Sequence, residues 1–60
     1  MKFEIESRVY VEGIGTITHT HTQEFSEDSN VFGRVLEYHK YMEKHFGNRQ
    51  FELVKAKEIR

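Results

Sequence analysis

The chain has 60 residues, a formal net charge of −1, 37% hydrophobic and 32% charged residues, and no cysteine. This length allows one domain with a small core, so we treat residues 1–60 as a single domain. The lack of cysteine excludes disulfide bonds, thiol catalysis and cysteine-ligated zinc. No run approaches the roughly 20 apolar residues of a membrane span. We therefore expect a complete, soluble, cytosolic protein without a membrane partner.

Residues 2–12 alternate between apolar and polar side chains, as a β-strand with one buried side does. Its apolar face carries Phe3, Ile5, Val9 and Val11. Gly13 and Gly15 follow, and glycines at this spacing supply the positive φ angles of a tight hairpin turn. The sequence therefore predicts a β-hairpin whose second strand begins near residue 16.

Residues 16–25 predict that second strand, because they are rich in β-branched threonine and keep a period of two. The threonines share one face. The other face carries Ile17, His19, His21, Gln23 and Phe25. This threonine- and histidine-rich strand is the most unusual local feature of the sequence.

A helix is predicted from residue 31 onward, because apolar residues recur there at spacings of three and four. Its expected apolar face carries Phe32, Val35, Leu36, His39, Met42 and Phe46. Ser26, followed by two acidic residues, indicates the helix start, with Ser29 as the competing cap. Gly47 predicts the end. Gly33 is unusual inside a helix, because glycine is a poor helix former. It indicates a close backbone approach or a late helix start, or it has no structural role.

Residues 50–59 predict a third strand. Its apolar residues do not share one face, since Phe51 and Leu53 occupy odd positions whereas Val54 and Ala56 occupy even ones. Either a bulge or partial cover of both faces explains this pattern. A right-handed crossover through the helix places this strand beside the first. The prediction is an α+β fold of order β-β-α-β: a three-stranded, mostly antiparallel sheet of order 2-1-3, with one helix packed on one face.

A homodimer is expected, because so short a chain without cysteine cannot build a large core and both sheet edges are open. Pairing of the threonine-rich edge strands and packing of helix faces are both open as dimer modes. The residues predicted to contact a partner or a second subunit are Thr18, His19, Thr20, His21, Tyr38, Tyr41 and His45.

His19 and His21 point the same way from one strand, so they could share a metal with a third ligand from His39, His45, Glu24 or a second subunit. The commoner arrangement has them beneath the helix or at a subunit contact, bonded to hydroxyl groups. His39, within the apolar stripe, is interpreted as a core or interface residue. We therefore predict no metal and no cofactor.

Catalytic motifs are missing: the chain has no phosphate-binding glycine loop, no nucleophile elbow and no HExxH. We predict no enzyme and no catalytic residues. Seven of the nine basic residues lie in 29–60, and a basic end offers an alternative, nucleic-acid-binding function. Its residues would be Arg49, Lys55, Lys57 and Arg60. The slightly negative net charge disfavours this alternative, because such binding depends on phosphate neutralisation.

In its length, its lack of cysteine and its β-β-α-β order, the chain resembles the very short proteins that phages encode to bind and block host defence systems, in particular inhibitors of Hachiman defence. The resemblance lies in the architecture and transfers no site residues. It implies a non-catalytic inhibitor that acts in the host cytoplasm. We therefore expect a small homodimer that works by binding another protein.

Overall fold

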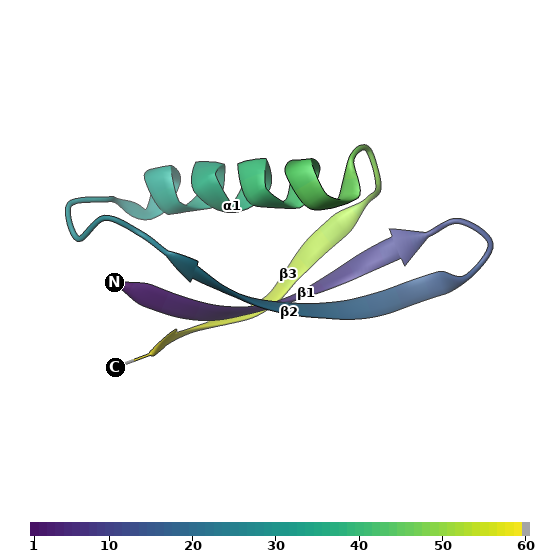
Figure 1. Ribbon diagram of the computed structural model, residues 1–60, viewed down its shortest axis with the longest axis horizontal. Coiled ribbons are helices and arrows are strands. Elements are labelled where there is room, and N and C mark those ends of the chain that lie inside the picture. Colours follow the sequence, from purple (N-terminus) through teal and green to yellow (C-terminus); the bar gives the residue numbers. More distant parts are fainter. Residues whose placement is uncertain (60) are drawn as a thin grey trace.

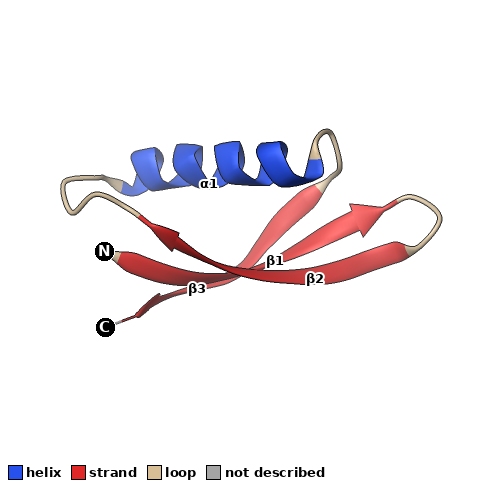
Figure 2. Ribbon diagram, viewed as in Figure 1, coloured by secondary structure: helices blue, strands red, loops and turns tan. Residues whose placement is uncertain are grey.

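The computed structural model describes residues 1–59 and contains four elements in the predicted order (Figure 1). These are β1 (Lys2–Val11), β2 (Gly15–Glu24), α1 (Val31–Phe46) and β3 (Phe51–Ile59). The sheet order is β2-β1-β3, and both neighbouring pairs are antiparallel. Figure 2 shows the helix in one layer and the twisted sheet in the other. The predicted α+β fold with order 2-1-3 is confirmed.

The β1–β2 hairpin forms as the glycine spacing predicts. Gly13 and Gly15 have φ angles of 85° and 110°, and the amide of Ile14 donates to the carbonyl of Val11 across the turn at 3.0 Å. Antiparallel partners share a face of the sheet, and Ile5 lies opposite His21. The histidines therefore lie on the helix side of the sheet.

Strand β3 contains the bulge that its mixed parity indicates. Glu6 pairs with Lys55 and the next residue, Ser7, pairs with Leu53, so Val54 is the extra residue. The side-chain alternation restarts after it. Leu53 and Ala56 therefore both face the helix side, although they have opposite parity. Of the two explanations for the mixed pattern, the bulge is confirmed.

The helix begins at Val31, where the periodicity begins, but the predicted cap residue is wrong. Asn30 is the cap, and its side-chain oxygen accepts a hydrogen bond from the amide of Gly33 at 2.8 Å. Ser26 and Ser29 instead close a turn before the helix, where the Ser29 amide donates to the Ser26 carbonyl. Gly33 lies inside the first turn of the helix, so it does not mark a later helix start. Gly47, with φ 66°, ends the helix as predicted.

Only part of the expected apolar helix face is covered by the sheet. The buried residues of α1 are Tyr38 and Met42. Phe32 is 81% exposed and Leu36 is 62% exposed, although the periodicity placed both on the same apolar face as Met42. A three-stranded sheet is narrower than the apolar stripe of this helix, so one edge of the stripe extends beyond it.

The core is small and contains one polar pair. Its apolar members are Ile5, Val9, Phe25, Tyr38 and Met42. Ser7 is fully buried among them, and its hydroxyl lies 2.8 Å from the hydroxyl of Tyr38. Each hydroxyl satisfies the other, so the polar pair avoids the cost of an unbonded buried group.

Ser7→Ala and Tyr38→Phe are each expected to lower the free energy of unfolding by about 1–3 kcal/mol, because each leaves one buried hydroxyl without a partner. The double variant should lose less than the sum of the two. Urea unfolding followed by circular dichroism measures all four members of this cycle. Strict additivity would contradict a coupled pair.

Candidate protein-binding face

The two flanks of the helix differ in how closely their side chains pack against the sheet. The flank toward β2 carries Tyr41, whose ring stacks on the ring of His21 with centroids 3.8 Å apart and planes 11° apart. His45 stacks on the outer side of Tyr41 at 4.0 Å. The rings of His19 and His21 lie 5.4 Å apart on β2. The helix thus covers the inner face of β2 with its own aromatic side chains.

Hydrogen bonds hold this histidine and tyrosine cluster in place. His19 Nε2 lies 3.1 Å from the Tyr41 hydroxyl, and His21 Nε2 donates to Gln23 Oε1 at 3.0 Å. His45 Nδ1 donates to the backbone carbonyl of Tyr41 at 2.9 Å. Burial, followed by the nearby charges of His21 and His45, lowers the pKa of His19 below its ordinary value of 6.5.

The histidines of this cluster are not arranged as metal ligands. Within residues 1–59, no group of three or more histidine or carboxylate side chains converges on one point. His39, one of the three candidate third ligands, lies on the other flank of the helix, where its ring packs 5.2 Å from that of Phe51. His19 lies beneath the helix and bonds to the Tyr41 hydroxyl, as the alternative interpretation predicts. His21 also lies beneath the helix, but it stacks on Tyr41 and bonds to the side-chain amide of Gln23 instead of to a hydroxyl.

The structure brings together four of the seven predicted contact residues: His19, His21, Tyr41 and His45. Thr18 and Thr20 are exposed and lie opposite Arg8 and Glu6, on the face of the sheet away from the helix. Tyr38 is 7% exposed and belongs to the core. Of the four clustered residues, only His45 is exposed.

The flank toward β3 is open and apolar. Val31 and Val35 of the helix and Leu53 and Ala56 of β3 line a groove of about 130 Å³. Its remaining lining residues are Phe3, Ile5, Phe25, Arg34 and Tyr38. Phe32 continues the apolar surface outward from Val35, which it precedes by three residues, and Leu36 adjoins Phe32, which it follows by four. We call Val31, Phe32, Val35, Leu36, Leu53 and Ala56 the α1–β3 face.

Sequence reasoning did not select this face as a contact surface. It assigned Phe32 and Leu36 to the apolar face of the helix and looked for partner contacts among tyrosines and histidines. The available signal was the width of the stripe: Val31, Phe32, Val35 and Leu36 crowd the first turns of the helix. A single-layer sheet cannot cover all of these together with Tyr38 and Met42.

The basic residues do not form one patch. Lys55 and Lys57 lie directly opposite Glu6 and Glu4 on the outer face of the sheet. Arg49 donates to the carbonyl of Phe46 at 3.2 Å, near the end of the helix. Arg60 lies outside the described residues. The register therefore sets an acidic residue beside each lysine of the proposed nucleic-acid surface.

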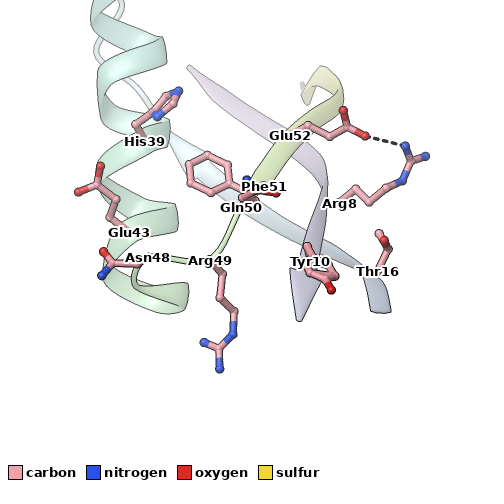
Figure 3. Close-up of a pocket in the computed structure, with 10 residues that line it drawn as sticks. All are labelled: Arg8, Tyr10, Thr16, His39, Glu43, Asn48, Arg49, Gln50, Phe51 and Glu52. Carbon is pink, nitrogen blue, oxygen red and sulfur yellow. Dashed lines mark hydrogen bonds and ion pairs between the residues drawn. The ribbon is translucent and has the colours of Figure 1, made fainter. Parts of the chain in front are cut away.

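A larger cavity, of about 590 Å³, lies where the helix end meets the start of β3 (Figure 3). His39 and Glu43 lie at one end of it and Thr16 at the other, so the hydroxyl and the imidazole are well separated. Arg8 and Glu52 form an ion pair at 2.7 Å on the far side of β3, and Arg49 points away into the open. This arrangement holds no nucleophile next to a base.

Comparison of the chain with protein families, with curated proteins and with solved structures gives no match. Across the described residues, no helix has the length and apolar character needed to cross a membrane. The site is therefore interpreted from its own chemistry.

Acidification is expected to destabilise the fold through His19. A lowered pKa in the folded state means that the unfolded chain binds more protons, so stability is retained above pH 6.5 and falls as the pH decreases below it. Urea unfolding at about pH 8 and about pH 5 measures this loss. His19→Gln should reduce the difference between the two values.

His39→Gln is the matched control for this prediction, because His39 is exposed and lies on the opposite flank. It should leave the pH dependence unchanged. An equal dependence in the wild type and in His19→Gln would contradict the assignment to His19.

Proposed function

We propose that this chain is a small, non-catalytic, self-associating protein that acts by binding another protein. The observation that carries the proposal is the α1–β3 face. Contiguous exposed apolar surface of this kind marks protein interaction sites in small domains. Leu53 is 51% exposed and Val31 is 69% exposed at the two sides of the groove.

The chemistry of the remaining surface supports binding over catalysis. The cavity of about 590 Å³ at the helix end is open and lacks a paired nucleophile and base. The histidine and tyrosine cluster is occupied by its own stacking and hydrogen bonds. A catalytic site needs a nucleophile or acid-base pair that can reach a substrate. The pair in the cluster, His19 and Tyr41, is part-buried, and its two groups bond to each other.

We further propose that the bound protein is a component of a host defence system and that the chain acts in the cytoplasm of that host. The support is architectural: sixty residues in a β-β-α-β fold with one exposed apolar face suit an inhibitor that acts by occupying a surface. Such an inhibitor blocks its target in proportion to the amount bound.

Expression of this chain in cells that carry Hachiman defence is expected to restore phage plaques toward the number on cells without that system. Leu36→Asp should abolish the restoration, because it places a charge on the α1–β3 face, where Leu36 is 62% exposed. Plaque counts on paired strains, with protein levels checked by immunoblot, measure the effect.

Ile14→Asp is the control for this assay, because Ile14 is equally apolar and 76% exposed but lies in the β1–β2 turn. It should inhibit as the wild type does. Failure of the wild type to restore plaques would contradict inhibition of this defence system. Equal inhibition by Leu36→Asp would contradict use of the α1–β3 face.

The protein is not expected to bind DNA or RNA in a salt-dependent way, because Glu4 and Glu6 lie opposite Lys57 and Lys55 and offset their charge toward phosphates. Fluorescence anisotropy with labelled duplex DNA and single-stranded RNA at low and high salt checks this. Binding that disappears in Lys55→Glu/Lys57→Glu would instead support the nucleic-acid alternative.

A further inference from the structure

We propose that a second copy of this chain occupies the α1–β3 face about a two-fold axis, with Phe32 of each protomer seated in the groove of the other. The inference rests on the proposed function in that it takes this face as a protein-binding face. It adds that the copies pair through this face, so that the dimer is the form that binds the defence protein, and it names the side chain that anchors the pair.

The groove has the size and lining of a site for one aromatic ring. Its volume is about 130 Å³, close to the roughly 150 Å³ of an apolar protein cavity that holds benzene. Val35, Leu53 and Ala56 surround the opening, and Ile5 of the core contributes to the lining. An apolar group that fills it gains contacts on every side.

Phe32 is the side chain on this face that most needs such a site. It is 81% exposed, more than any other exposed large apolar side chain of the described chain. It lies in the first turn of α1, three residues before Val35, so it is a neighbour on the helix surface of a residue that lines the groove of its own chain. A protruding ring and a receiving groove therefore lie side by side on one surface.

That juxtaposition favours a second copy over an unrelated protein. In a two-fold dimer the same patch faces itself, so a protrusion next to a cavity is satisfied twice by one rotation. An unrelated partner would have to supply both a matching ring and a matching cavity. Central aromatic anchors in fitted pockets are also the side chains that dominate the energy of protein interfaces.

The exposed area agrees with this dimer. The chain exposes 4748 Å², whereas a compact monomer of 7.2 kDa exposes about 4,100 Å². Burying the excess of roughly 600 Å² on each protomer gives about 1,200 Å² in total, the lower bound for a specific, stable interface. The excess accessible area is thus about the area that each protomer of a small dimer buries.

The same side of the molecule carries the open edge of β3. A two-fold mate on this side brings the two β3 edges together in antiparallel directions, where their unpaired backbone groups can bond to each other. The β2 edge is also open, but it has no apolar groove beside it, because its inner side chains His19 and His21 are already covered by Tyr41.

Sedimentation equilibrium of the purified wild type is expected to give twice the chain mass of 7.2 kDa. Phe32→Asp should weaken the dimer by about tenfold or more, as loss of a central aromatic anchor does. This variant is suited to the test because aspartate in the first turn of a helix is favourable, and this turn holds no acidic residue. Ile14→Asp is the matched control and should remain dimeric.

Ala56→Phe provides a second variant, because its ring fills the groove without adding charge. It should weaken the dimer as Phe32→Asp does, with an unchanged circular dichroism spectrum. In a dimer of one ¹³C-labelled and one unlabelled protomer, isotope-filtered NOEs are expected between the Phe32 ring of one chain and the Ala56 methyl group of the other.

A wild type that stays monomeric up to millimolar concentration would overturn the inference. So would a dimer that tolerates both groove variants as well as it tolerates Ile14→Asp, or an assembly larger than a dimer. These outcomes are separate from the plaque assay. A monomer that still inhibits defence would refute the dimer and leave the proposed function, and a confirmed dimer without inhibition would do the reverse.

Discussion

The buried hydrogen bond between Ser7 and Tyr38 sets how α1 lies on the sheet. Ser7 is on the central strand and fully buried, so its hydroxyl must find a partner on the covering helix. Tyr38 provides one at 2.8 Å, and this contact turns Tyr38 and Met42 toward the sheet. With Tyr38 and Met42 directed at the central strand, only the side chains on the two flanks of the helix can contact β2 and β3.

The two flanks then take different roles. Toward β2, Tyr41 stacks on His21 and bonds to His19, so the helix completes that side of the fold with its own side chains. Toward β3, Val35 and Leu53 line an open groove. The asymmetry follows from the rotation of one helix, and it explains why Val31, Val35 and Leu53 are exposed on the side of β3.

Much of the fold was predictable because its signals are local. The period of two in β1 and β2 and the glycines of the hairpin and the helix end each depend on a few neighbouring residues. The helix cap was missed because Ser26 and Asn30 are both good caps, and only the turn formed before the helix selects between them. The candidate face was missed for a different reason. Periodicity groups Phe32 with Met42, but the width of the sheet decides which of them is covered, and that width is a tertiary property.

The bulge at Val54 makes the candidate face apolar. Without an extra residue, the alternation that places Phe51 and Leu53 on the helix side would continue to Lys55 and Lys57, and two lysines would line the groove. With it, Ala56 lies opposite Ile5 and faces the groove, while Lys55 lies opposite Glu6 on the outer face. In β3 the apolar residues therefore change from odd to even positions, and this change leaves an apolar inner face and an outer face on which lysines lie opposite glutamates. The apolar character of the α1–β3 face depends on that single inserted residue as much as on the helix above it.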